Sequence, residues 1–122
     1  MGAMENQLIH RQYEQFLASL EGRTVRIDYD PQHDSLYVFG DEPWSPEIRE
    51  KPRTFAVTSG IRIDVLLGNN RVYGAEIDDF QAALMRHGGH LLISWWEELP
   101  KDDSISVDGH RLLAAIQQVS LV

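Results

Sequence analysis

Hydrophobic positions near the start of the chain follow a helical period. Between Asn6 and Glu21 apolar side chains recur at spacings of four, three, one and three residues, which places them on one face of an α-helix. These positions are Ile9, Tyr13, Phe16, Leu17 and Leu20. Gly22 follows, and glycine is a typical residue at the end of a helix. The pattern therefore predicts an amphipathic helix over residues 6–21.

The period then changes to two, which is the period of a β-strand. Over Thr24–Asp30 apolar side chains alternate with charged ones, and the alternation resumes at Leu36 and Val38. Between them lies Asp30-Pro31-Gln32-His33-Asp34. Asp before Pro favours a turn, because proline fixes its own φ and biases the preceding residue away from helix. The segment predicts a β-hairpin in which Asp30 and Asp34 are structural residues of the turn.

A second hairpin is predicted after a polar, proline-rich loop over residues 41–51 that carries Trp44. Apolar side chains alternate at Phe55, Val57, Ile61, Ile63, Val65 and Leu67, and the return strand holds Tyr73, Ala75 and Ile77. Gly68-Asn69-Asn70 supplies residues that tolerate the positive φ of a tight reversal, and Gly74 lies within the return strand. The two hairpins predict a four-stranded antiparallel β-meander with one apolar and one solvent-exposed face.

Helical spacing returns after residue 77. Asp78 or Asp79 is expected to cap a short helix that Gly88-Gly89 ends. Residues 91–99 favour another helix over the alternative of a strand, and Pro100 closes it. Ser106 or Asp108 is expected to start the last helix, whose apolar stripe is Leu112, Leu113, Ile116 and Val119.

These patterns predict a single α+β domain over residues 1–122. Its core is the four-stranded β-meander over residues 24–77, covered by the N-terminal helix and by a helical C-terminal extension over residues 78–122. Met1 to Ala3 is expected to be a vector-derived remnant that precedes the natural start.

Composition narrows the classes of partner. The chain has 122 residues, of which 19 are acidic and 11 basic, for a formal charge of −8. Such a surface repels phosphate backbones, so nucleic-acid binding is not expected and a basic protein partner is favoured. The absence of cysteine excludes disulfides and thiolate ligands and fits a cytoplasmic protein. No apolar run reaches the ~20 residues of a membrane helix, and no signal peptide is apparent.

Two segments resemble a known family. They read IDYDPQHDSLYVF from Ile27 and GIRIDVLLGNNRVYGAEIDDFQAAL up to Leu84. Both are similar to the YuzE-like domain of unknown function of small bacterial proteins, the second through its glycine-turned hairpin ending in Gly-Ala-Glu-Ile. The resemblance implies a small β-meander with a helix and no assigned catalytic residue. Because such proteins are often encoded beside small toxin-like proteins, it also implies an antitoxin-like binding role.

Acidic residues and histidines form several candidate metal or catalytic groups. Asp28, Asp30 and Asp34 fail the spacing of a calcium loop, because the sixth and twelfth positions from Asp28 are His33 and Phe39 rather than Gly and Glu. We therefore predict no metal ligand, cofactor or catalytic residue. The alternative is a small metal-dependent hydrolase; its candidate residues are Glu76 with Asp78 and Asp79, or His87, His90 and His110.

The sequence Trp95-Trp96-Glu97-Glu98 is the strongest candidate for a partner-binding site. Adjacent side chains on a helix diverge by about 100°, so one tryptophan is expected inside and the other at the rim. Tryptophan is frequent in binding hot spots, and the glutamates would favour a basic surface. With Trp44, these residues predict a non-catalytic acidic protein-binding module, antitoxin-like in role. A homo-oligomeric structural protein, for instance a homodimer, is a further alternative.

Overall fold

The computed structural model describes residues 2–51, 53–56, 61–69 and 71–120. The helices are α1 (Gly2–Ala18), α2 (Phe80–His87), α3 (His90–Glu98) and α4 (Gly109–Ser120). The strands are β1 (Thr24–Asp30), β2 (Ser35–Phe39), β3 (Arg53–Ala56), β4 (Arg62–Gly68), β5 (Arg71–Asp78) and β6 (Ile105–Asp108). The predicted α+β class is confirmed.

The strand order corrects the predicted four-stranded meander. The described residues form one six-stranded antiparallel sheet in the order β3-β4-β5-β2-β1-β6. The long loop after β2 carries the chain to the far edge of the sheet, and β5 then returns to pair with β2, as Leu36 opposite Ile77 shows. Local periodicity predicts strands but not which strands become neighbours. The predicted strand position Val57 and the predicted turn residue Asn70 lie outside the described residues.

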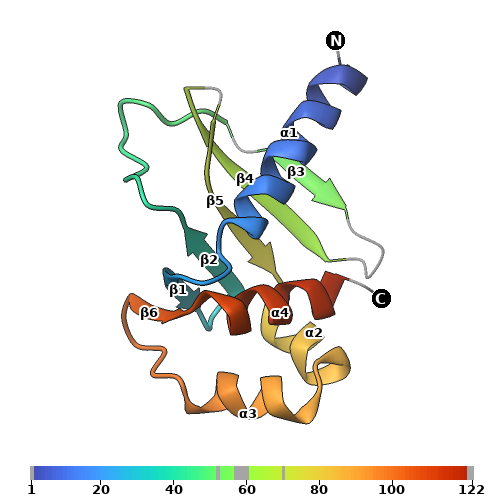
Figure 1. The fold of residues 1–122 in the computed structure, drawn as a ribbon, viewed down its shortest axis with the longest axis vertical. Helices are drawn as coiled ribbons and strands as arrows, with labels where there is room; N and C mark the ends of the chain where they lie inside the picture. The colour runs from blue at the N-terminus through green and yellow to red at the C-terminus, as the bar shows by residue number, and fades with distance from the viewer. Residues whose placement is uncertain (1, 52, 57–60, 70, 121–122) are drawn as a thin grey trace.

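The helices cover one face of the sheet (Figure 1). Helix α1 packs on β5, and α4 packs on β6 and against α2 and α3. The predicted apolar stripe is confirmed at Tyr13 and Phe16, which are buried on α1. Leu20 is also buried, but it follows α1, which ends at Ala18 rather than at the predicted residue 21. The shared core contains Ile27, Leu36, Val38, Ile63, Ile77, Phe80, Leu84, Leu112 and Ile116. Each such side chain stabilises the fold by about 1.5–3 kcal/mol on burial, so this core fixes the sheet on which other side chains are displayed.

The N-terminus of α2 is capped from the first hairpin, which corrects the predicted cap. Asp79 adopts a left-handed conformation with φ 57° and its side chain makes no capping hydrogen bond. Instead the carboxylate of Asp34 accepts hydrogen bonds from the backbone N–H groups of Gln81 (2.8 Å) and Ala82 (3.0 Å). The Tyr29 hydroxyl donates a third, at 2.8 Å. Asp34, predicted as a turn residue, thus caps the N-terminus of α2.

Asp30 lies in the turn of the first hairpin and bonds to its neighbours there. Its carboxylate accepts a hydrogen bond from the backbone N–H of Gln32 at 3.0 Å and lies 2.6 Å from Nδ1 of His33. The hydrogen bond with His33 lowers the pKa of Asp30 below its usual value. Asp30 therefore stays ionised, bound to the turn that it closes.

Gly68 and Gly74 are required by close backbone approaches. A Cβ atom on Gly74 would lie 2.4 Å from the carbonyl oxygen of Val38, across the β2–β5 pair. One on Gly68 would lie 2.9 Å from the carbonyl oxygen of Ile48. The positive φ of this turn is taken by Asn69, at 48°. The absence of a side chain at both positions lets the loop and β2 lie close to the second hairpin.

The C-terminal segment departs from a purely helical extension. Residues 90–98 are helical, as favoured, and α2 ends before Gly88 as predicted. Residues 105–108, however, form β6 against β1, so Ser106 does not start the last helix. Helix α4 begins at Gly109, where Asp108 Oδ1 accepts the backbone N–H of His110 at 3.3 Å. Ile105 and Val107 alternate with polar residues, as in a strand. The pattern covers only four residues directly before α4, so the sequence alone does not distinguish it from the start of that helix.

Candidate functional site

The face of the sheet opposite the helices displays a polar and aromatic surface, which we call the open sheet face. Successive side chains of a strand point to opposite faces, so the neighbours of the core residues in each strand lie here. Strand register aligns Asp28, Tyr37, Glu76, Asp64 and Thr54 in one row across five strands. Ser35 lies opposite Asp78 in the adjacent row. Residues distant in sequence are therefore brought together by pairing alone.

Three carboxylates meet on this face. Asp64, Glu76 and Asp78 each place one oxygen within 4.8 Å of the others. Asp64 is buried, with 8% of its surface exposed, and its Oδ1 accepts a 2.5 Å hydrogen bond from the Thr54 hydroxyl. We call these three residues the carboxylate cluster.

Arg62 is the cation nearest to the cluster. Its guanidinium lies 3.4 Å from Asp64 and 3.7 Å from Asp78. Its side chain is 61% exposed, so solvent screens this charge and weakens both contacts. Asp78 has a second partner in the Ser35 hydroxyl, which donates a hydrogen bond at 2.9 Å. Arg62 therefore compensates the cluster only in part.

Glu76 has an unusual proton affinity. Partial burial, a hydrogen bond with Asp78 and the charges of Asp78 and Asp64 raise its pKa from an ordinary 4.5 to about 7, with Arg62 opposing. Burial and the charge of Glu76 in turn raise the pKa of Tyr37. Near pH 7 Glu76 is therefore about half protonated, and a cation placed beside it would favour the ionised carboxylate.

An apolar hollow of about 300 Å³ lies on the open sheet face beside the cluster. It is lined by Asp28, Tyr29, Asp30, Tyr37, Phe39, Trp44, Arg49 and Leu66. The rings of Tyr37 and Phe39 stack with centroids 6.4 Å apart. The indole N–H of Trp44 donates to the Leu67 carbonyl at 2.7 Å, and Arg49 lies over its ring at 4.4 Å. We call this the aromatic hollow; the predicted binding residue Trp44 forms one of its walls.

The predicted tryptophan site lies elsewhere and is more buried than expected. Trp96 is 1% exposed; its indole N–H donates to Gln81 at 2.8 Å, and its ring packs edge-on against Tyr29 and Phe80. Trp95 is also buried, at 8% exposed, which corrects the expectation that one ring sits at the rim. The fold places one ring in the core and the other against α4. Glu97 and Glu98 are exposed, so the prediction of partner binding there rests on them and on Trp95.

The alternative hydrolase residues are only partly brought together. Within the described part of the chain, the group with the geometry of a metal site is the carboxylate cluster, which includes the predicted Glu76 and Asp78. Asp79 turns away into the start of α2, and His110 pairs with Glu21 at 2.6 Å. Asp64 was missed by sequence reasoning. It sits between Ile63 and Val65 and so faces the same way as Glu76 once β4 and β5 pair.

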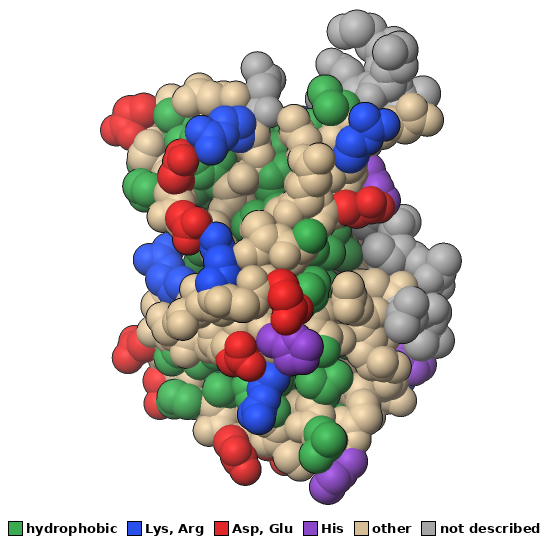
Figure 2. All heavy atoms as spheres, viewed as in Figure 1, with side chains coloured by type: hydrophobic (Ala, Val, Ile, Leu, Met, Phe, Trp, Pro, Cys, Tyr) green, Lys and Arg blue, Asp and Glu red, His purple; other side chains and the backbone are tan. Residues whose placement is uncertain are grey.

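Charged side chains on the helix-bearing face are distributed differently from those on the open sheet face. Figure 2 shows acidic and basic side chains interspersed there, with hydrophobic side chains between them. No helix of the described residues is long and apolar enough to cross a membrane. Comparison with protein-family models, curated proteins and solved structures found no match to the chain.

Proposed function

We propose that the protein is a non-catalytic binding module that captures a basic segment of a partner protein on its open sheet face. The observation that carries the proposal is the carboxylate cluster beside the aromatic hollow. A lysine or arginine has an apolar stem and a cationic head, and such a side chain buries its stem along apolar surface while its head stays polar. We expect the apolar stem to pack in the aromatic hollow and the cationic head to contact the carboxylate cluster.

Electrostatics supports a basic partner. A cationic head next to Glu76 would displace its proton, because an opposite charge favours the ionised carboxylate. The cationic head is then attracted by three ionised carboxylates, those of Glu76, Asp64 and Asp78. The formal charge of −8 adds long-range steering, which raises association rates for basic partners.

The aromatic residues support a protein rather than a free ion as partner. Tyrosine and tryptophan are enriched in interface hot spots, and Tyr37 and Trp44 both line the hollow. Arg26 and Arg49 already lie over Phe39 and Trp44, at 4.6 and 4.4 Å from the ring centres. The same surface therefore accommodates guanidinium groups from its own chain and suits another from a partner.

The resemblance to the YuzE-like family gives this role a biological setting. The resembling segments, Ile27 to Leu84, contain the carboxylate cluster and most of the aromatic hollow. An antitoxin-like protein in the cytoplasm would mask a basic, toxin-like partner with such a surface. The product of a gene adjacent to the one for this chain is the first partner to test.

The test is binding of a lysine- and arginine-rich peptide, measured by isothermal titration calorimetry. Glu76→Gln with Asp78→Asn should weaken binding about tenfold, which corresponds to about 1.4 kcal/mol. The matched control is Glu97→Gln with Glu98→Gln, which removes the same number of charges at the other predicted site. Equal losses of peptide affinity in both double variants would show that only net charge matters. A larger loss in the control would show that the binding site lies on α3.

A divalent-cation site is the second candidate, because three clustered carboxylates are the donor set that Mg²⁺, Mn²⁺ or Ca²⁺ prefers. It would support the metal-dependent hydrolase alternative. Thermal shift with each cation and with Zn²⁺ tests it, using Asp64→Asn as the matched variant. Unchanged melting of the wild-type protein with all four ions would reject it.

A further inference from the structure

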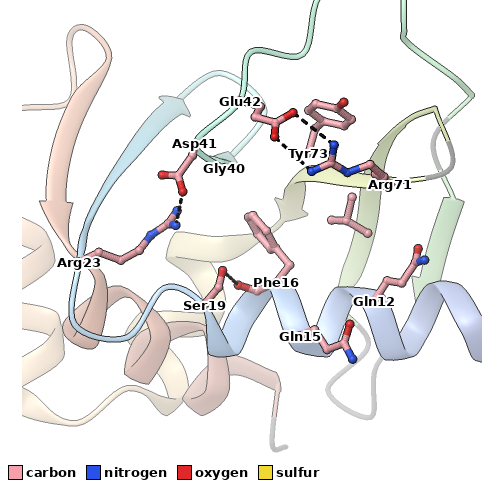
Figure 3. Close-up of a pocket in the computed structure, with 11 residues that line it drawn as sticks. Gln12, Gln15, Phe16, Ser19, Arg23, Gly40, Asp41, Glu42, Arg71 and Tyr73 are labelled. Carbon is pink, nitrogen blue, oxygen red and sulfur yellow. Dashed lines mark hydrogen bonds and ion pairs between the residues drawn. The ribbon is translucent and has the colours of Figure 1, made fainter.

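A second hollow lies away from the open sheet face, between α1 and the first residues of β5 (Figure 3). Its volume is about 400 Å³. Helix α1 contributes Gln12, Gln15 and Phe16, and the facing wall comes from residues 40–42 and 71–73. We call it the α1 cavity. Its size falls within the roughly 300–1,000 Å³ of small-molecule sites.

The charged residues of the α1 cavity are paired, so its walls are polar without a net charge. Arg23 Nη1 binds Asp41 Oδ2 at 2.6 Å. Arg71 binds Glu42 through both terminal nitrogens, at 3.1 and 3.4 Å. Figure 3 shows one pair at each end of the cavity. Because a carboxylate neutralises each guanidinium, the cavity favours an uncharged ligand over a strongly charged one.

Two buried polar atoms of the lining residues have no hydrogen-bond partner within the described structure. They are Oε1 of Gln12 and Nε of Arg23. One is an acceptor and the other a donor, and most buried polar atoms in folded proteins are paired. Both atoms are covered in the ligand-free protein, so a ligand that offers a donor to Gln12 and an acceptor to Arg23 would complete both once these side chains rotate toward the cavity.

The middle of the cavity is apolar. Figure 3 shows the ring of Phe16 pointing from α1 into the space between the two ion pairs. Val72 also lines this part. The α1 cavity thus combines an apolar middle with hydrogen-bonding groups at its ends. A flat heteroaromatic molecule has the matching distribution, an apolar face with donors and acceptors along its edge.

We propose that the α1 cavity binds an uncharged heteroaromatic molecule of nucleoside size. Phe16 and Val72 contact the face of the ring system, while Gln12 and Arg23 bind its edge or its sugar hydroxyls. This site is separate from the open sheet face, so a small-molecule ligand and a partner protein bind independently. Failure of one proposal leaves the other standing, since Glu76→Gln should leave ligand binding unchanged.

The probes are adenosine, guanosine, cytidine and uridine, tested by saturation-transfer NMR and calorimetry on the full chain. At least one should bind with a Kd below about 1 mM. Gln12→Leu keeps the side-chain volume but removes the acceptor, and should weaken binding about tenfold. Gln7→Leu, on an exposed position of the same helix, is the matched control and should have no effect.

A second variant guards against a folding defect in the first. Gln15→Trp starts from an exposed position and fills the cavity, so it should abolish binding while the far-UV circular dichroism stays unchanged. No binding by any nucleoside would overturn the proposal, as would binding that survives both variants. The anionic 5′-monophosphates and zwitterionic phenylalanine serve as comparisons that carry ionised groups. Tighter binding of either class than of the nucleosides would contradict an uncharged ligand.

Discussion

Two groups of acidic residues in this protein look alike in sequence and behave in opposite ways. In the first hairpin, Asp30 and Asp34 accept hydrogen bonds from backbone N–H groups, a histidine and a tyrosine. On the open sheet face, Glu76 faces Asp64 and Asp78, which are themselves carboxylates. The pKa of Asp30 is lowered, whereas that of Glu76 is raised to about 7. Asp30 and Asp34 meet donors and stabilise the fold, whereas Glu76 faces carboxylates and is more readily protonated than an ordinary glutamate.

The largest expected effect comes from breaking the structural group. Asp34→Ala removes both capping hydrogen bonds of α2 and the partner of Tyr29. We expect the free energy of unfolding to fall by about 2 kcal/mol or more, measured by urea denaturation.

Two variants control this result. Asp34→Asn keeps a side-chain acceptor and tolerates the positive φ of this position, so it should lose less. Asp30→Ala, in the exposed turn, should lose much less than Asp34→Ala. Equal losses from Asp30→Ala and Asp34→Ala would show that the turn, and not the cap, stabilises the hairpin.

Removing a charge from the carboxylate cluster should raise the free energy of unfolding, whereas Asp34→Ala lowers it. The folded pKa of Glu76 is raised above its ordinary 4.5, so its contribution to stability is complete below pH 4.5 and is lost as the pH rises through about 7. Glu76→Gln should therefore stabilise the protein at pH 8, by about 1 kcal/mol after allowance for solvent screening, and have no effect near pH 4. Thermal unfolding at the two pH values measures this. Destabilisation at pH 8 would contradict the crowding of carboxylates.

Binding should depend on pH in the same window. A basic segment binds ionised Glu76, so affinity for the lysine- and arginine-rich peptide should fall a few-fold between pH 8 and pH 6. In Glu76→Gln the fall should disappear. A pH dependence that persists in this variant would assign the titrating group to another residue, such as a histidine.

Trp44→Ala should separate binding from stability. Trp44 lines the aromatic hollow and makes one hydrogen bond to Leu67, whereas Trp96 lies in the core. We expect Trp44→Ala to weaken peptide binding several-fold with a small change in unfolding free energy. Trp96→Ala should do the reverse, with a loss of about 3–5 kcal/mol. Peptide binding that is indifferent to Trp44→Ala would remove the aromatic hollow from the proposed interface.

The limits of sequence reasoning follow from the range of the interactions. The α1 stripe, the first hairpin and the end of α2 at Gly88 are local patterns, and each was predicted correctly. The cap on α2 comes from Asp34, 47 residues before Gln81, and no local pattern marks such a pair. The carboxylate cluster depends on the pairing of β4 with β5, which local periodicity does not predict. Asp64 occupies one of the polar positions in the alternating pattern of β4, and strand pairing places that position beside Glu76.

The most direct test of the proposed function is an NMR titration of the Glu76 side-chain carboxyl, with and without the basic peptide. We predict a pKa of about 7 in the protein alone. Binding of the peptide should shift it downward, because a cationic group takes the place of the proton. A pKa near 4.5 in the protein alone, or a pKa that the bound peptide leaves unchanged, would contradict a cation-binding role for the open sheet face.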